Sequence, residues 1–425
     1  MSKWKKMTIG DFITLQRGHD LTNEEREVGN VPVYGAAGKN GYHSKSLASG
    51  PGLIIGRSGG SFGKVYFVKE SYWPHNTSLY ATDFKENDPR FAFYLLTQMD
   101  LSSLNSGSAQ PSLNRNYIYP LPIEVPEPFQ QRKIAAVLSA LDDKIELNNR
   151  INVELEQMAK TLYDYWFVQF DFPDANGKPY KSSGGKMVYD EVLKREVPED
   201  WSTELINDLG TIVGGSTPSK ANEENFCQDG IPWITPKDLS MNVGNKFITK
   251  GESDVSDKGM KNASLNILPV KSVLMSSRAP IGYLAINRVS CTTNQGFKSI
   301  ICNKKYSCEY VYYVLDRYMP LIEANATGST FKEISATIFK SINIVMPKRE
   351  IVEEFVSKIK PILEKQDNLE QQNQELAALR DWLLPMLMNG QVKVGDIPKK
   401  YDLKNEQALT EAESIVAYEK IHTSS

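Results

Sequence analysis

Two segments that lie far apart in this chain have the same layout. Residues 107–126 (GSAQPSLNRNYIYPLPIEVP) align without a gap on residues 328–347 (GSTFKEISATIFKSINIVMP). Both begin with Gly-Ser, continue with alternating apolar residues and end with proline, and long stretches of helical character follow them at 129–170 and 351–388. A duplicated unit constrains the fold more than any local motif, because repeated sequence implies repeated structure. We therefore expect two similar but non-identical heads, each followed by a long helix.

The composition is that of an ordinary globular protein. The 425 residues are 40% hydrophobic and 24% charged, which is enough for two or more domains with cores. The net charge of -3 excludes a uniformly basic binder but leaves room for a local basic groove. The sequence lacks an apolar run of membrane-spanning length and an apolar N-terminal core, so we expect no membrane span, no secretion signal and a cytoplasmic location. The four cysteines show no CxxC spacing and are expected to be reduced.

The chain alternates between two kinds of segment. Short β-type runs between glycines and prolines predict mainly β heads, with helix candidates at 91–101 and 310–319. The expected fold class is therefore α+β, in which two mainly β domains alternate with two long helices as a pseudo-two-fold internal repeat. The expected order is a first head at 1–127, a helix at 128–170, a connector at 171–200, a second head at 201–347, a helix at 348–390 and a tail at 391–425.

The long helical stretches carry heptad spacing with polar residues in the middle. Asparagine or glutamine in such a seam costs stability but can fix register and partner. We expect the two helices to pair as an antiparallel coiled coil that holds the heads apart; the alternative is two independent helices, each packed on its own head. Pro361 predicts a kink or a restart of the second helix. The candidate interface residues are Leu138, Leu141, Ile145, Asn148, Asn152, Leu155, Ile362, Gln366, Leu369, Asn373 and Leu376.

An arginine recurs on a turn after an apolar strand in both heads. Arg57 lies in GRSGGSFGK (56–64), which lacks the GxxxxGK[ST] pattern and precedes a β-type run, so nucleotide binding is not indicated. Arg278 lies in SRAPIG (277–282) at the equivalent place. An arginine on a glycine-flanked turn can approach a phosphate or the O6/N7 edge of guanine. The alternative is a hairpin arginine in solvent.

Two further places recur. Asn76 in HNTS (75–78) corresponds to Asn294 in TNQG (293–296), and such amides either pair with adenine or cap a turn. The Gly-Ser loops of the duplicated block carry Arg115 and Lys332, which suit phosphate contacts. The DNA-contact candidates are Arg57, Ser58, Lys64, Asn76, Ser108, Arg115, Arg278, Asn294, Gln295, Lys298, Ser329 and Lys332.

Catalytic and metal-binding motifs are not found. None of the four histidines stands at helical spacing from another histidine or from a cysteine, so no zinc site is predicted. The sequence lacks GxSxG, HExxH and a Rossmann glycine fingerprint. The pattern does not indicate an enzyme.

Four segments together resemble one family, the specificity (S) subunits of Type I restriction–modification systems, over about residues 4 to 397. The opening of the first long helix, the connector and the end of the second helix resemble the family's conserved regions, and one segment resembles the entry to a target recognition domain. The segments are QQRKIAAVLSALDDKI (130–145), YDYWFVQFDFPDANGKPYKSSGG (163–185), GGSTPS with GIPWIT (214–219 and 230–235), and LRDWLLPMLMNG (379–390).

This resemblance implies a DNA-reading subunit without catalytic activity. Two target recognition domains are then expected to read the halves of a bipartite, asymmetric double-stranded target, with the helices setting the gap. The implied partners are two modification subunits, which bind S-adenosylmethionine and methylate adenine, and restriction subunits that use ATP and Mg to translocate and cleave DNA. The alternatives are an S-like chain that serves a fused restriction–modification polypeptide, a silent or decoy variant, and an enzyme with a cryptic active site.

Overall fold

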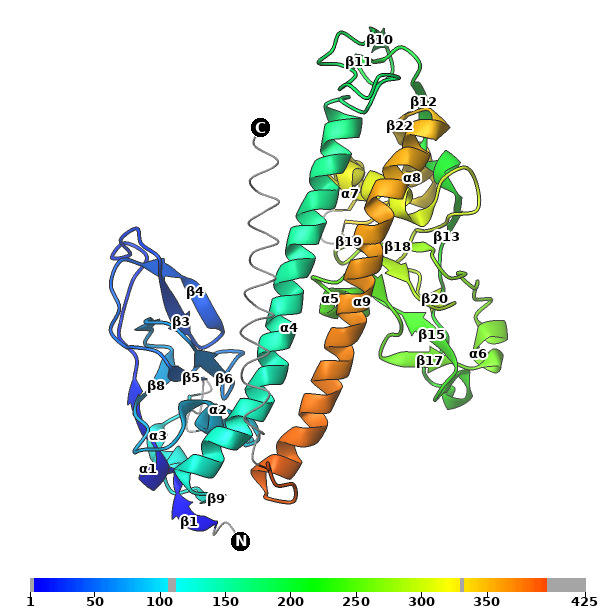
Figure 1. Ribbon diagram of the computed structural model, residues 1–425. Helices are drawn as coiled ribbons and strands as arrows, with labels where there is room; N and C mark the ends of the chain where they lie inside the picture. Colours follow the sequence, from blue (N-terminus) through cyan, green and yellow to red (C-terminus); the bar gives the residue numbers. More distant parts are fainter. Residues whose placement is uncertain (1–3, 106–111, 329–331, 396–425) are drawn as a thin grey trace. The chain divides into compact units, whose positions relative to one another are not determined.

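The computed structural model describes residues 4–105, 112–328 and 332–395 (Figure 1). Their backbone forms two compact units, of which the first contains the chain up to residue 143 together with the residues from 376 on, and the second contains residues 144–375. The boundary between the two units falls inside both long stretches of helix, whereas the predicted domain boundaries keep each stretch whole. Within the described residues no helix combines the length and the apolar character needed to cross a bilayer.

The first unit is built on two small sheets and a strand pair. Short helices cover them: α1 (Ile9–Phe12), α2 (Pro89–Thr97) and α3 (Arg115–Ile118). The strands are, in sheet order, β2 (Thr14–Arg17), β8 (Ser78–Asp83), β5 (Gly52–Gly56) and β6 (Val65–Val68); then β4 (Gly38–His43), β3 (Val31–Gly35) and β7 (Trp73–Pro74); and the pair β1 (Lys5–Thr8) and β9 (Pro122–Val125).

The second unit repeats this plan with larger sheets. Its helices are α5 (Pro236–Met241), α6 (Asp257–Asn262), α7 (Cys308–Ala324) and α8 (Ala336–Lys340), and a hairpin of β10 (Met187–Asp190) and β11 (Arg195–Pro198) precedes them. The strands are, in sheet order, β13 (Thr211–Val213), β21 (Ser299–Ile301), β18 (Val273–Ser277), β19 (Ile281–Asn287) and β16 (Phe247–Ile248); then β14 (Phe226–Cys227), β17 (Ser253–Val255), β15 (Ile231–Ile234) and β20 (Thr292–Thr293); and the pair β12 (Ser202–Leu205) and β22 (Asn343–Met346).

The predicted duplication is confirmed by the structure. In the duplicated block Asn114 caps the N-terminus of α3 and the aligned Ser335 caps α8, because each side chain accepts a backbone N–H of the first turn. The strand that follows pairs antiparallel with the first strand of its own head, β9 with β1 and β22 with β12. The same sequence pattern therefore folds into the same unit twice, and each copy leads into a long helix.

The long helices pair antiparallel, as predicted. They are α4 (Pro128–Tyr163), which ends in the π-helical turn η2 (Asp164–Val168), and α9 (Arg349–Met388). Within the second unit Asn148 Nδ2 donates to Asn373 Oδ1 at 2.9 Å, and Gln366 Nε2 donates to the carbonyl of Asn152 at 3.3 Å. Partner numbers fall on one helix as they rise on the other, which is the signature of an antiparallel pair. The alternative of two independent helices is wrong.

The prediction of a restart at Pro361 is also wrong, since α9 runs through this residue without a break. Pro361 is exposed, so water can replace the hydrogen bond that its missing N–H would have made. The two helix candidates inside the heads are confirmed with shifted ends. The candidate at 91–101 corresponds to α2, which stops at Thr97, and the candidate at 310–319 lies within the longer α7.

Each unit buries its part of the helix pair in its own core. In the first unit Leu138 of α4 and Leu387 of α9 belong to one buried cluster with Phe91 of α2. The buried cluster of the second unit contains many aromatic side chains, and Phe167 contacts Phe355 edge-on with ring centroids 4.9 Å apart. Edge-to-face pairs of this kind add about 0.5–1.5 kcal/mol beyond the burial of their area.

Candidate nucleic-acid interface

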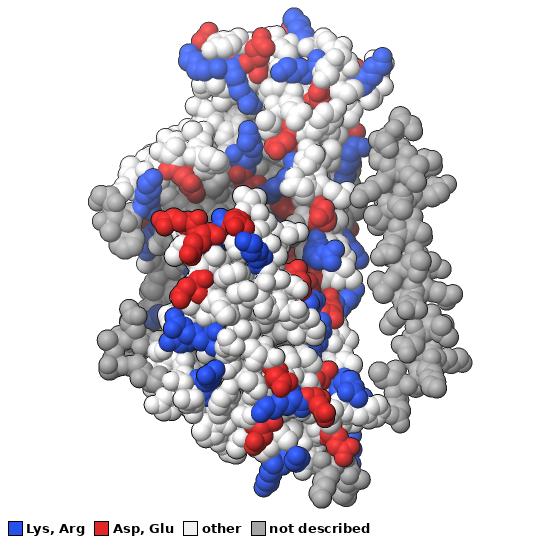
Figure 2. Space-filling view, turned by 90° about the vertical axis from the view of Figure 1, so that its left-hand side faces the viewer, with Lys and Arg blue, Asp and Glu red and all other residues white. Residues whose placement is uncertain are grey.

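A cavity of about 730 Å³ opens in the first unit where strand β2 ends and the duplicated block begins. Three arginines line it together with the turn at Gly18 and His19. Over the face shown in Figure 2, cationic and acidic side chains are interspersed rather than separated by sign. A local group of arginines is therefore the feature that could hold an anion here. The lining residues are Gln16, Arg17, Gly18, His19, Asp20, Arg57, Leu79, Ser112, Leu113, Asn114 and Arg115.

Arg57 is placed at this cavity by the backbone on both of its sides. It follows β5, its N–H donates to the carbonyl of Thr77 at 2.9 Å, and its carbonyl accepts from Leu113 N at 2.9 Å. Its guanidinium makes one long contact, 3.4 Å, to the carbonyl of Asn76. A carbonyl does not neutralise a guanidinium, so the charge of Arg57 remains available to an anionic ligand.

Arg115 and Arg17 reach the same cavity from other elements. Arg115, the first residue of α3, donates from Nη1 to the carbonyl of Leu15 at 2.9 Å, which ties its side chain to strand β2. Arg17, the last residue of β2, lies 3.9 Å from Asp20, and both side chains are exposed. The structure therefore brings the two predicted cations, Arg57 and Arg115, to one cavity together with a third, Arg17.

The glycine that follows Arg17 is required by a close backbone approach. A Cβ at Gly18 would lie 2.1 Å from the carbonyl oxygen of His75, and a Cβ at Gly215 in the second head would lie 1.9 Å from that of Thr293. No side chain fits at such distances. The loops 75–78 and 293–296, which the sequence pattern paired, thus lie against equivalent glycines in the two heads.

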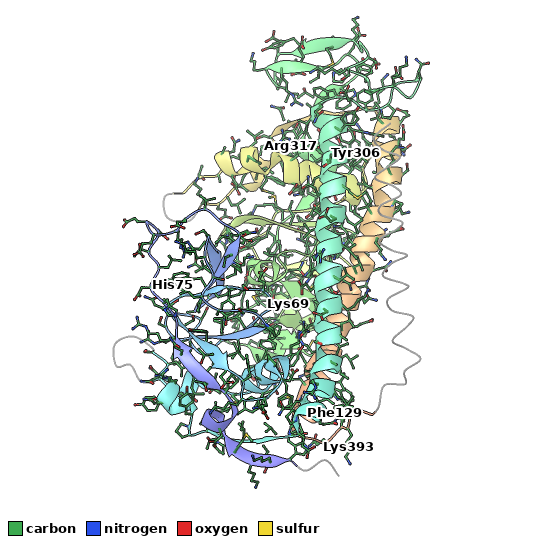
Figure 3. The ribbon with its side chains drawn as sticks, turned by 60° about the vertical axis from the view of Figure 1, so that its left-hand side comes forward. Lys69, His75, Phe129, Tyr306, Arg317 and Lys393 are labelled. Atoms are coloured by element: carbon green, nitrogen blue, oxygen red, sulfur yellow. The ribbon has the colours of Figure 1, made fainter. Side chains whose placement is uncertain are left out.

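The other described candidates of the first head, Ser58, Lys64 and Asn76, do not line the cavity. Asn76 donates its amide to Asp20, and Ser58 forms a backbone bridge to Ser112. Lys64 is exposed and does not line the cavity. His75 (Figure 3) is partly buried, which lowers its pKa, and its Nδ1 lies 3.0 Å from Thr77 Oγ1. Ser108 lies outside the described residues.

In the second head the equivalent arginine has a carboxylate partner. Arg278 follows β18, and its guanidinium lies 3.6 Å from Glu333, which also lies 3.8 Å from Lys298 Nζ. Antiparallel bridging between Arg278 and Glu333 fixes the two backbones. Glu333 is partly exposed whereas Lys298 is largely buried, and desolvation lowers the pKa of the Lys298 ammonium. The structure thus joins two predicted cations through one acidic residue.

The two amide candidates of the second head, Asn294 and Gln295, have different hydrogen-bond partners. Asn294 Oδ1 accepts the N–H of Gly296 at 2.9 Å, so this side chain caps its own turn, which was the alternative interpretation. Gln295 is exposed and accepts a hydrogen bond from Thr217. Lys332 is exposed beside Glu333, and Ser329 lies outside the described residues.

The helix candidates lie on α4 and α9, and the polar ones among them make the hydrogen bonds between the two helices, Asn148 with Asn373 and Gln366 with Asn152. Leu138, Asn148, Asn152, Gln366 and Leu369 are buried inside this chain. Their remaining companions are half-buried, namely Leu141, Ile145, Leu155, Ile362, Asn373 and Leu376. Leu138 and Ile362 pack in the cores of their own units, and whether any of these side chains also meets another subunit stays a prediction.

Arg17 and Glu333 are functional candidates that the sequence analysis missed. Arg17 stands at the end of a short strand with no motif around it. Glu333 occupies the position in the duplicated block that aligns with Ser112, so the alignment of the two copies contains a usable signal. A carboxylate in one copy where the other has a hydroxyl marks a position at which the heads differ in charge.

Comparison with known proteins decides the family. The family model described as the Type I restriction modification DNA specificity domain matches residues 1–157 and 198–378, one match for each head. The chain belongs to this family. The resemblance inferred from the sequence is thereby confirmed, and each of the two matches includes a head together with part of the helix that follows it.

Individual relatives agree with this assignment. The Type I restriction enzyme HindI specificity subunit of Haemophilus influenzae is 29% identical over 362 residues, covering 72% of this chain and 77% of that protein. The MjaIX specificity subunit of Methanocaldococcus jannaschii is 34% identical over 236 residues, covering 52% of this chain and 54% of that protein. A crystal structure of a Type-I restriction-modification system S subunit from M. genitalium superimposes with a TM-score of 0.61 at 16% identity, covering 93% of this chain and 97% of that chain, so the fold is shared.

Proposed function

We propose that this chain is the DNA-reading subunit of a Type I restriction–modification complex and that each head reads one half of a bipartite, asymmetric target. One observation carries the proposal. The same arginine-bearing turn recurs on equivalent strands of the two heads, yet the Arg57 guanidinium contacts a backbone carbonyl whereas Arg278 shares a carboxylate with Lys298. Two domains that recognise different half-sites need different chemistry at equivalent positions, and Arg57 and Arg278 provide it.

The chemistry at each head suits DNA. Arginine binds phosphate or the O6/N7 edge of guanine through two parallel N–H groups, and the first head brings Arg57, Arg115 and Arg17 to one cavity. In the second head the carboxylate of Glu333 is an acceptor that suits the exocyclic amino group of cytosine. The first head is therefore proposed to favour base edges that are rich in hydrogen-bond acceptors. The second head is proposed to combine its cationic donors, Arg278 and Lys298, with the acceptor Glu333.

Catalysis is proposed to belong to partner subunits. Two modification subunits would bind S-adenosylmethionine and methylate adenine, and restriction subunits would use ATP and Mg. The methyltransferase must take its adenine out of the base stack, which a subunit held on both half-sites can support. The complex would act in the cytoplasm, where it meets double-stranded DNA. The helix pair is proposed to set the gap between the half-sites.

The test is co-expression of the full chain with the modification subunit in a host without adenine methylation, followed by mapping of methylated adenine over the genome. A two-part motif with a fixed gap is expected. Arg57→Gln should relax one half of this motif and Arg278→Gln the other. A well-formed complex that methylates nothing would mean a silent variant. A single uninterrupted motif would mean that the heads do not read separate halves.

A further inference from the structure

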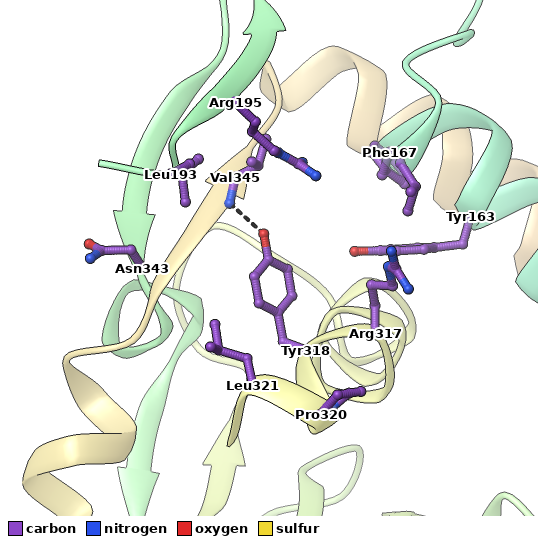
Figure 4. A pocket seen from close by; sticks show the side chains of 11 residues that line it. Tyr163, Phe167, Leu193, Arg195, Arg317, Tyr318, Pro320, Leu321, Asn343 and Val345 are labelled. Atoms are coloured by element: carbon purple, nitrogen blue, oxygen red, sulfur yellow. Dashed lines mark hydrogen bonds between the residues drawn. The ribbon is translucent and has the colours of Figure 1, made fainter. Parts of the chain in front are cut away.

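The second unit contains a cavity of about 340 Å³ that none of the predicted DNA-contact residues lines. The π-helical turn η2, the turn of the β10–β11 hairpin, helix α7 and strand β22 enclose it (Figure 4). π-helical turns are rare in proteins, and those that occur are often found at functional sites. The wall carries five polar side chains, and no carboxylate of the described residues lines it. The five are Tyr163, Arg195, Arg317, Tyr318 and Asn343.

Tyr163 has a hydroxyl without a partner at this cavity. Its side chain is only 5% exposed, and its ring stacks on Tyr313 with centroids 6.1 Å apart. The hydroxyl points into the cavity and makes no hydrogen bond to any residue that the structure describes. The hydroxyl opens onto the cavity and is therefore available to a ligand there. Tyr318 accepts the N–H of Val345 at 2.9 Å, so its own proton is still free to be donated.

The two guanidinium groups have no carboxylate beside them in the cavity wall, although Asp190 faces Arg195 across the β10–β11 hairpin from outside it. Arg195 lies over the ring of Phe170, 5.1 Å from its centroid, and within the described part of the chain neither Arg195 nor Arg317 forms an ion pair. The carboxylate next to Arg317 in sequence, Asp316, is 2.9 Å from Lys160 and is thereby engaged elsewhere. The cavity therefore offers hydrogen-bond donors and positive charge, and no described residue of its wall neutralises them.

We propose that this cavity binds a small organic anion, a carboxylate or phosphate monoester attached to a short apolar body. Figure 4 shows Arg195, Arg317 and the Tyr163 hydroxyl on one side, where they suit an anionic head, while Leu193 and Leu321 line the other side. Guanidinium groups bind carboxylate and phosphate through paired N–H donors. The volume is at the lower end of the range for small-ligand sites, about 300–1,000 Å³. The proposal does not depend on how the heads read DNA.

Binding is tested on the purified full chain with matched anionic and neutral probes. Sodium pentanoate is compared with pentanamide, and phenyl phosphate with phenol, by calorimetric titration and by the shift in the thermal unfolding temperature. A ligand that binds only the folded state raises that temperature in a saturable way. We expect both anions to do so and both neutral compounds to fail. Equal stabilisation by the neutral compounds would show that the cavity is merely apolar.

Variants place the binding at this cavity. Arg195→Gln combined with Arg317→Gln should weaken anion binding by about tenfold or more, because two charged hydrogen-bond donors are lost. Tyr163→Phe should weaken it by about threefold to tenfold without lowering the unfolding temperature of the free chain, since the hydroxyl has no partner to lose. Arg150→Gln is the matched control, because Arg150 is an exposed arginine of α4 in the same unit and should bind as the wild type does.

Three further outcomes overturn the proposal. Retention of binding in the double variant would place the anion elsewhere. If the wild type binds no probe and the double variant loses the modification subunit, the cavity receives a carboxylate of that partner. If the wild type binds no probe and the double variant shows a shallower salt dependence of DNA binding, the two arginines contact a DNA phosphate.

Discussion

Lys246 Nζ donates to the Glu156 carboxylate at 2.5 Å in the interior of the second unit and thereby ties the second head to helix α4. Lys246 is only 4% exposed and also contacts the Tyr313 hydroxyl. Burial opposes the ionisation of Glu156, but the attraction of Lys246 outweighs it and holds the pKa of that carboxyl below its ordinary value. Glu370 of α9 accepts the backbone N–H of Lys246 at 2.7 Å. One lysine therefore connects the head to both helices.

Removing this lysine should destabilise the second unit strongly. Lys246→Met removes the closest cation of the largely buried Glu156 carboxylate and leaves it Lys160 at 3.8 Å, and loss of such a buried partner costs up to about 3–5 kcal/mol. The free energy of unfolding is measured by urea denaturation of the full chain. Lys246→Met combined with Glu156→Leu should recover much of the loss. Lys237→Met is the control, because the Lys237–Glu252 pair is exposed and should contribute less than about 1 kcal/mol. An equal effect of both lysines would contradict the anchoring role.

Two asparagines of the helix seam should respond to leucine with opposite signs. Both amide atoms of the Asn152 side chain are buried without a partner in the described part of the chain, so Asn152→Leu should stabilise the protein by about 1–3 kcal/mol. Asn148 donates to Gln372 at 2.7 Å and to Asn373 at 2.9 Å, so Asn148→Leu should destabilise it by about 1 kcal/mol or more. Thermal unfolding of the two variants checks this, and stabilisation by both would mean that the Asn148 hydrogen bonds contribute nothing.

Glu333→Ser should alter the reading of one half-site only. The substitution gives the second head the residue that the first head has at the aligned position, Ser112, and it frees Arg278 and Lys298 from their shared carboxylate. We expect a changed or relaxed base at one position of the second half of the methylation motif. Each additional phosphate that the freed cations bind should steepen the slope of log affinity against log salt by about 0.9. An altered first half-site, or no change in either, would count against a role in base reading.

Lengthening the helix pair should lengthen the gap between the half-sites. One heptad is inserted after Asp143 in α4 and a second after Glu375 in α9, which preserves the seam on both helices. Seven residues add about 10.5 Å of helix, or roughly three base pairs of B-DNA. Methylation mapping should therefore show the same half-sequences with a wider gap. Insertion in α4 alone is the control and should disrupt the pair. Unchanged spacing with both insertions would falsify the proposal that the helices set the gap.

The duplicated block was predictable because its signals are local. Ser335 and Asn114 are capping residues at aligned positions, and the alternating apolar residues that follow define a strand in both copies. The helix seam was predictable for the same reason, since a period of seven is visible in the sequence without knowledge of the partner. The restart at Pro361 was wrongly predicted because the exposure of this residue, which decides the cost of the missing N–H, is not a local property.

The candidate interface was predictable only in part. The turns that carry Arg57 and Arg278 could be matched by their position after an apolar strand, and the structure places both at corresponding sites. Their electrostatic state could not be inferred, because it depends on whether a carboxylate from a distant loop reaches the guanidinium. Glu333 does so in one head, and Ser112 at the aligned position cannot.

The sequence by itself determined the repeat, the alternation of heads and helices, the antiparallel seam and the family, since each depends on periodicity or on residue order along the chain. Only the tertiary structure decided which charges are paired. Lys246 and Glu156 are 90 positions apart, and the cavity at Tyr163 combines side chains from four separate elements. The energy of a charge depends on its distance from other charges and from water, and folding sets both distances.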